Sequence, residues 1–158
     1  MSLAKPSLLS VKGAKLRIGI VAARFNEPLV DALLARVQAG LLAAGVQAKN
    51  IAVVRVPGSH EVPWAVEALA RGRDGVIGLG VLIGGDTNHH EMVGQSVSHA
   101  LQRVALDTGV PVINGVIVAD TLVRARARCT GRIDRGVEFA RAALEMAVLR
   151  RQIGGKKL

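Results

Sequence analysis

Short apolar runs alternate along the chain with longer segments in which apolar residues recur every three or four positions. The runs lie at 16–23, 50–58, 74–85 and 110–120, and the third, DGVIGLGVLIGG, is almost entirely apolar. Apolar runs of this length that end at Gly, Pro or Asn predict strands. The nearly continuous third run predicts a strand that is buried on both faces.

The segments between the runs predict helices. Apolar residues repeat with helical spacing in 28–45, 61–72 and 90–109, and each of these segments ends at a glycine. The remainder of the chain after Asp120 also reads as helical, with a break at 129–136, CTGRIDRG. Asp120 itself is predicted to cap the helix that follows it.

This alternation predicts one α/β domain with three layers, in which helices cover both faces of a four-stranded parallel sheet. We expect the domain to span residues 13–151, with a flexible segment at 1–12 and a basic tail at 152–158. The sequence contains no repeat and no internal linker.

In parallel sheets of this kind, ligands bind beyond the carboxyl ends of the strands. The four loops at that edge are predicted at residues 23–26, 57–61, 84–90 and 114–120. These loops are therefore the first places to look for chemistry.

The composition limits the class of protein. The core must be aliphatic because Phe25, Trp64 and Phe139 are the only aromatic residues, and Trp64 is interpreted as a core residue. The single cysteine, Cys129, cannot form an internal disulfide and is interpreted as a small buried residue. No segment has the length and hydropathy of a signal peptide or a membrane span, so we expect a soluble, cytoplasmic protein.

The formal net charge of +9 raises the question of nucleic-acid binding, because many of the basic residues lie in 124–157. A basic segment could follow a phosphate backbone, but a solvated helix face and a basic tail are the more usual explanation of such a charge run. The scarcity of aromatic residues excludes a platform on which bases stack. We expect no specific nucleic-acid partner.

Residues 84–93, GGDTNHHEMV, allow several kinds of site. Adjacent His89 and His90 do not have the helical spacing that metal ligands prefer, so no metal is expected. Two glycines and a threonine before a predicted helix suit an anion, since the first amides of a helix are unpaired. Asp86 or Thr87 could instead simply cap that helix, and a histidine here could also act as a general base.

The order of four motifs resolves these alternatives. ARFN, VPGSHEVP, LGVLIGGDTNHHEMV and PVINGVIVADT, followed by RAR, together resemble the lumazine synthase family over about Leu16–Leu149. The resemblance implies a flavodoxin-like fold with the strand order 2-1-3-4. It also implies a transferase of riboflavin biosynthesis that condenses 5-amino-6-ribitylamino-2,4-pyrimidinedione with 3,4-dihydroxy-2-butanone 4-phosphate. The expected product is 6,7-dimethyl-8-ribityllumazine, with phosphate and water released and no cofactor required. The family further implies a homopentamer, or a shell of twelve pentamers, and association with riboflavin synthase.

The resemblance also implies roles for individual residues. Those that match the pyrimidine and ribityl site are Phe25, Asn26, Ser59, His60, Glu61, Val81, Leu82, Ile83 and Asn114. Those that match the phosphate site are Gly85, Asp86, Thr87, Arg128, Arg132 and Arg135. His89 matches the family's proton-transferring histidine, and Asn114 and Arg128 are expected to come from the neighbouring subunit.

Three positions depart from the family pattern. Gly84 stands where Arg or Lys is usual, and both His90 and Asn114 stand where Phe is common. The alternative to an enzyme is a non-catalytic flavodoxin-like protein that binds flavin, lumazine or RNA. The pairing of His89 with Arg128 favours the enzyme, because a binding protein needs neither proton transfer nor an exit for phosphate.

Overall fold

The computed structural model describes residues 4–154 and contains one four-stranded parallel sheet. Its strands are β1 (Ile18–Ala23), β2 (Ile51–Val56), β3 (Gly75–Ile83) and β4 (Val112–Ala119), in the spatial order β2-β1-β3-β4. The predicted three-layer fold and the strand order 2-1-3-4 are confirmed.

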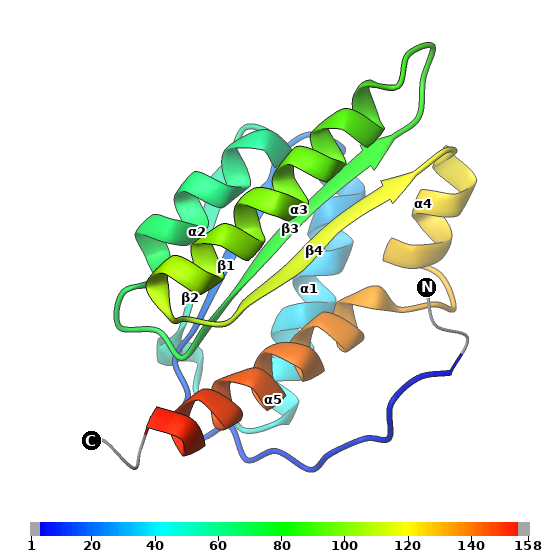
Figure 1. The fold of residues 1–158 in the computed structure, drawn as a ribbon. Helices are drawn as coiled ribbons and strands as arrows, with labels where there is room; N and C mark the ends of the chain where they lie inside the picture. The colour runs from blue at the N-terminus through cyan, green and yellow to red at the C-terminus, as the bar shows by residue number, and fades with distance from the viewer. Residues whose placement is uncertain (1–3, 155–158) are drawn as a thin grey trace.

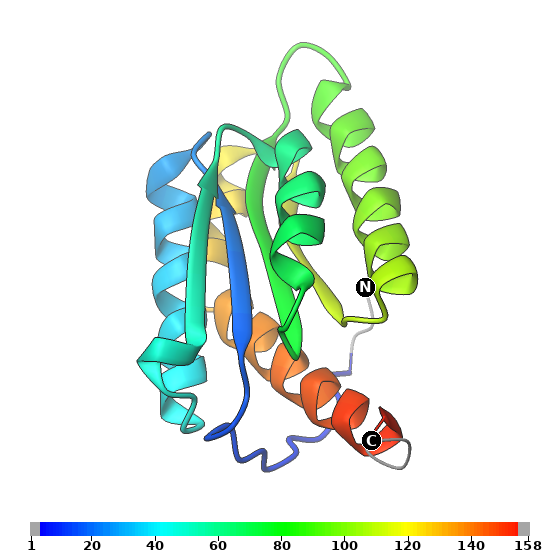
Figure 2. The same cartoon turned by 90° about the vertical axis from the view of Figure 1, so that its left-hand side faces the viewer.

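Helices cover both faces of the sheet (Figures 1 and 2). They are α1 (Glu27–Ala43), α2 (Val62–Ala70), α3 (His89–Thr108), α4 (Leu122–Cys129) and α5 (Arg135–Gly154), with short 3₁₀ turns at Ala48–Asn50 and Ser59–Glu61. Helices α2 and α3 pack on one face, and α1, α4 and α5 pack on the other. The predicted break before the last helix is present between α4 and α5.

The core consists of two largely aliphatic layers, one on each face of the sheet, and Phe139 is the buried aromatic residue among them. Ile20 and Leu79 point toward the layer that contains α1 and α5, whereas Val21 and Val76 point toward the layer that contains α2 and α3. This division follows from the two-residue period of a strand, which sends successive side chains to opposite faces. Strand β3 is buried over its first seven residues, as its apolar sequence predicts.

Two sequence predictions about single residues are wrong. The side chain of Trp64 is 76% exposed on α2, because the helix turns its small neighbours toward the sheet instead. Asp120 does not cap α4; Thr121 is the N-cap residue, and its hydroxyl accepts a hydrogen bond from the Arg124 amide at 3.2 Å. The Asp120 carboxylate forms an ion pair with the Arg124 side chain at 2.6 Å.

The ends of the described chain are partly engaged with the domain. Val11 packs against the core, and Lys5 forms an ion pair with Glu138 at the start of α5. Helix α5 continues to Gly154, so residues 152–154 of the expected tail are helical, while residues 155–158 lie outside the described part. Within residues 4–154, none of the helices combines the length and the hydropathy that a membrane crossing requires.

Candidate active site

The carboxyl edge of the sheet is uneven, and this creates a hollow. Strand β1 pairs with β3 only as far as Ala22 opposite Leu79, whereas β4 accompanies β3 to its last residue, Ile83. The last residues of β3 therefore have no strand beside them on the β1 side. A cavity of about 510 Å³ lies at this place.

The cavity collects the ends of three strands. It is lined by Phe25, Asn26, Gly58, Ser59, His60, Glu61, Val81, Leu82, Ile83, Gly85, Thr87, His89, His90 and Val93. Eleven of the residues proposed from the sequence thus lie together, all except Asp86, Asn114 and three arginines. Volume alone does not single out this hollow, because another of about 780 Å³ lies at the opposite edge, between the C-terminal parts of α3 and α5.

The loop after β2 forms one wall of the cavity. The Ser59–Glu61 turn is closed by Glu61, whose Oε2 accepts a hydrogen bond from the Gly58 amide at 2.9 Å. The Phe25 ring packs against Gly58, where an added Cβ would stand 3.1 Å from both the ring and the Glu61 carboxylate. Glycine at position 58 therefore allows the aromatic ring and the carboxylate to lie close together.

Ser59 occupies an unusual position in this wall. It is only 4% exposed, and its hydroxyl has no hydrogen-bond partner among the described residues. The hydroxyl packs over Gly80 of β3, where a Cβ would stand only 2.3 Å away. A buried hydroxyl without a partner is costly, so this group is suited to a ligand that reaches it.

The loop after β3 carries the predicted phosphate site and the histidine. Gly84 donates its amide to the Ala119 carbonyl at 2.8 Å, and a Cβ at Gly84 would lie 2.5 Å from the Asp120 carbonyl oxygen. This close approach explains the glycine in structural terms. The loop then passes Gly85 and Thr87, both exposed, and enters α3 at His89.

The start of α3 has no side-chain cap. Asn88 is the N-cap residue and makes no capping hydrogen bond, so the alternative that Asp86 or Thr87 serves as the N-cap residue is wrong. The Thr87 hydroxyl accepts only a long hydrogen bond, of 3.4 Å, from the His89 amide. The free amides and partial positive charge of this helix end remain available to an anion.

Five residues proposed from the sequence do not line this cavity. Asp86 is exposed in the loop beside it, and the Asn114 side chain accepts a hydrogen bond from the Val116 amide on β4 at 3.0 Å. Arg128 is in α4, where its guanidinium donates to the Arg124 carbonyl at 3.0 Å. The remaining two are Arg132, exposed after α4, and Arg135, at the start of α5.

The surroundings of Arg135 bear on its expected role. Its guanidinium forms an ion pair with Glu138 at 2.5 Å and lies 5.2 Å from the centre of the Phe139 ring. This arginine is thus already paired within its own helix. Cys129 of α4 is fully buried, as expected, and burial raises the pKa of its thiol to about 11.

The structure adds Gly58, His90 and Val93 to the residues proposed from the sequence. Glycine 58 could have been found from its place in a Pro-Gly turn at a strand end. The position of His90 could not, because its direction depends on where α3 begins.

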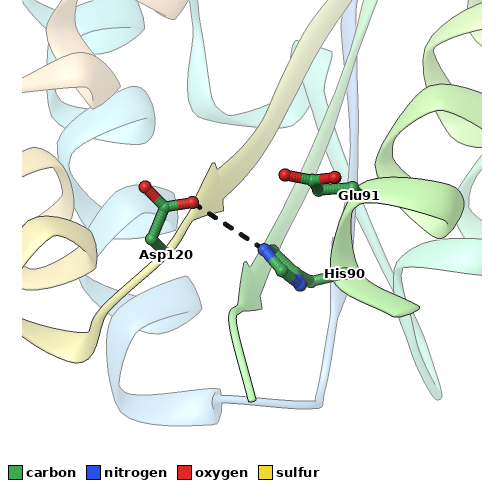
Figure 3. Close-up of side chains that lie close together, drawn as sticks. All are labelled: His90, Glu91 and Asp120. Atoms are coloured by element: carbon green, nitrogen blue, oxygen red, sulfur yellow. Dashed lines mark ion pairs between the residues drawn. The ribbon is translucent and has the colours of Figure 1, made fainter. Parts of the chain in front are cut away.

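His90 also belongs to a small polar group with Glu91 and Asp120 (Figure 3). One ligand atom from each lies within 4.8 Å of the others, and His90 Nε2 is 3.9 Å from an Asp120 oxygen. Asp120 is already paired with the Arg124 guanidinium, which would repel a divalent cation. Both carboxylates are also exposed. The arrangement therefore does not carry a metal site, and metal-independence remains a prediction.

Comparison with known proteins shows to which family the chain belongs. The model of the 6,7-dimethyl-8-ribityllumazine synthase family matches residues 15–151. The chain belongs to the 6,7-dimethyl-8-ribityllumazine synthase family. A family member from Paracidovorax citrulli is 48% identical over 139 residues, covering 87% of this chain and 88% of the relative. One from the fungus Pyricularia oryzae is 40% identical over 180 aligned residues, covering 88% and 90%.

The family match spans all four strands and all three loops that line the cavity.

Proposed function

We propose that the chain is a lumazine synthase, which condenses 5-amino-6-ribitylamino-2,4-pyrimidinedione with 3,4-dihydroxy-2-butanone 4-phosphate. The observation that carries this proposal is the cavity itself. In a chain of this family, it places Phe25, Glu61 and His89 around the free end of β3. These are an aromatic face for a ring, a carboxylate for hydroxyl donors and an imidazole that can donate or accept a proton.

Each wall of the cavity is suited to one part of the substrates. Phe25 stacks on the pyrimidine ring, while Ser59, His60 and Glu61 meet the ribityl hydroxyls. The unpartnered hydroxyl of Ser59 supports this assignment, since a sugar-alcohol chain can both donate and accept. Residues 85–87 and the start of α3 hold the phosphate of the second substrate.

The reaction uses these groups without requiring a metal or redox cofactor. The ring amine attacks the ketone, a Schiff base forms with loss of one water, phosphate leaves, and ring closure expels a second water. Holding two substrates in register can contribute about 7–11 kcal/mol to the lowering of the barrier. Proton transfer by His89 adds a smaller factor, on the order of 10²–10⁴.

Within residues 4–154, no Arg or Lys lines the cavity, so this part of the chain supplies no guanidinium or ammonium group for the phosphate there. We infer that Arg128 and Asn114 of a neighbouring copy complete it, in a homopentamer or a shell of twelve pentamers. Exposed apolar side chains support a buried interface; they include Val53, Val54, Trp64, Val118 and Val123. Of the two later arginines, Arg132 is the better phosphate ligand, since Arg135 is paired with Glu138.

We further propose a cytoplasmic enzyme that can associate with riboflavin synthase. The alternative of a non-catalytic flavin, lumazine or RNA binder has no specific observation in its favour. Mixing the purified protein with both substrates decides between them. An enzyme yields lumazine absorbance and fluorescence together with released phosphate. A binding protein changes the spectrum of a ligand without forming product, which would refute the proposal.

The shared site is tested separately by complementation. His89→Ala chains and Arg128→Ala chains are unfolded and refolded together. In closed rings with random order, about a quarter of the sites then combine both intact groups, so activity returns well above either parent. If mass measurement shows mixed rings and activity stays at the parental level, the site lies within one chain.

A further inference from the structure

Asn26 lies where three elements meet at the carboxyl edge of the sheet. Its side-chain amide donates a hydrogen bond to the Val81 carbonyl at 2.8 Å, across 55 residues of sequence. Its own carbonyl accepts the first hydrogen bonds of α1, from Leu29 and Val30, at 3.0 and 3.1 Å. The preceding residue, Phe25, donates its amide to the Pro57 carbonyl after β2 at 3.1 Å.

The backbone of Asn26 is in the left-handed region, with φ 56° and ψ 43°. This conformation is uncommon for residues other than glycine, and asparagine is among those that tolerate it best. The turn directs the side chain toward β3, away from the course of the main chain. Asparagine therefore satisfies two requirements here, a positive φ and a donor at the right reach.

The bond to Val81 stands where a strand partner is missing. Strand β1 pairs with β3 only up to Leu79, so the next carbonyl on that side of β3 would face the cavity unpaired. In a strand, backbone groups that point to one side recur every second residue. The Asn26 amide thus supplies, two residues after Leu79, the hydrogen bond that the main chain of β1 no longer provides.

We propose that Asn26 is a positioning residue and not a direct ligand of the ribityl chain. It fixes the free end of β3, which forms the floor under the heterocycle, relative to Phe25. This inference rests on the proposed lumazine synthase function and changes the role that the family resemblance implies for Asn26. Asn26 should therefore affect the binding of the pyrimidine ring to the same extent whether or not the ring carries a ribityl chain.

Two variants remove the donor in different ways. Asn26→Asp keeps the shape and tolerance of a positive φ but replaces the amide donor by an oxygen. Asn26→Gly keeps the backbone conformation and removes the side chain. Asn50→Asp is the matched control, because Asn50 lies in the 3₁₀ turn before β2, at the opposite edge of the sheet. Circular dichroism and thermal unfolding establish that each variant is folded.

The discriminating measurement uses two ligands. One is the substrate 5-amino-6-ribitylamino-2,4-pyrimidinedione, and the other is 5,6-diamino-2,4-pyrimidinedione, which has the ring without the ribityl chain. Both Asn26 variants should weaken the binding of both ligands by the same factor, roughly three- to tenfold, as expected when one partly buried hydrogen bond is lost. The KM for the butanone phosphate should change less than twofold, and Asn50→Asp should match the wild type.

Each other result has a definite meaning. A loss confined to the ribityl ligand would show that Asn26 contacts that chain directly, and the proposal would be wrong. Unchanged affinity for both ligands, or a loss in Asn26→Asp alone, would also overturn it. If the wild type binds neither ligand and forms no product, the proposed function fails instead.

Discussion

The carboxylate of Asp74 is expected to be a major stabilising group of the fold. It lies just before β3, is 7% exposed and accepts three hydrogen bonds. One comes from the Arg17 amide at 2.7 Å, and two come from the Arg151 guanidinium at 2.7 and 2.8 Å. The ion pair between Asp74 and Arg151 holds the C-terminal part of α5 against the amino edge of the sheet.

The substitution Asp74→Asn tests this with little change of shape. An amide has one acceptor oxygen, so at least one charge-assisted hydrogen bond is lost, which costs about 1.5–3 kcal/mol. The Arg151 side chain is 44% exposed, so solvent screening places the expected cost in the lower half of that range. For a chain of this length the Tm should fall by roughly 3–8 °C. The control Asp107→Asn breaks an exposed pair with Arg103 and should cost under about 1 kcal/mol.

The pH dependence of the unfolding free energy provides a second test of the same prediction. Burial alone would raise the pKa of Asp74, but the hydrogen bonds from Arg151 and Arg17 and the charges of Arg151 and Arg150 together hold it below 3.8. The folded-state pKa thus lies below the unfolded one, and the stabilisation is complete above the unfolded pKa. The stabilisation is lost as the pH falls through the folded pKa.

Urea unfolding of the wild type and Asp74→Asn at equal protein concentration, from pH 7 to pH 3, measures this difference. The gap in unfolding free energy should be constant from pH 7 to 5 and shrink below about pH 4. Equal stability at pH 7, or a gap that persists unchanged at pH 3, would refute the reasoning.

Other predictions concern the site and its neighbourhood. His89→Ala should lower kcat by roughly ten- to a thousandfold with little change in substrate affinity; a wild-type rate at neutral pH would exclude His89 as the base. Arg128→Ala should raise the KM for the butanone phosphate far more than that for the pyrimidine, and equal effects would count against a phosphate role. Cys129 should react with a thiol reagent only after unfolding, because it is fully buried and its pKa is raised to about 11. Turnover should survive exhaustive chelation, whereas a loss that zinc restores would revive a metal role near His90.

The fold class could be predicted from the sequence because buried strands give short apolar runs, whereas helices repeat apolar residues every three or four positions. The apolar runs and the helical repeats placed all four strands, and β3 is buried as its run of apolar residues indicates. The strand order came from the family resemblance and is confirmed. The same patterns failed at Trp64, since nine residues of α2 contain enough small apolar side chains to face the sheet without it. Hydropathy alone does not say which of several apolar residues a short helix buries.

The candidate site was predictable where its residues follow strand ends. Phe25, Glu61 and His89 follow the ends of three different strands, β1, β2 and β3, and the parallel sheet brings them to one cavity. The arginines could not be placed in the same way, because they do not follow strand ends: Arg128 lies in α4, Arg132 lies after it, and Arg135 begins α5. The pairing of Arg135 with Glu138, three residues apart on α5, depends on where the helix starts.

The groups that we expect to stabilise the fold and the groups that we propose for catalysis lie at opposite edges of the sheet. At the amino edge, Asp74 is buried with its hydrogen bonds satisfied, and α5 is tied there by Arg150 and Arg151. At the carboxyl edge, residues 85–89 are exposed, and the buried hydroxyl of Ser59 has no hydrogen-bond partner within residues 4–154. An unsatisfied group of this kind lowers the stability of the free protein and strengthens the complex with a ligand that pairs with it. Changes in the loop should therefore alter turnover while leaving Tm nearly constant, and changes at Asp74 should do the reverse.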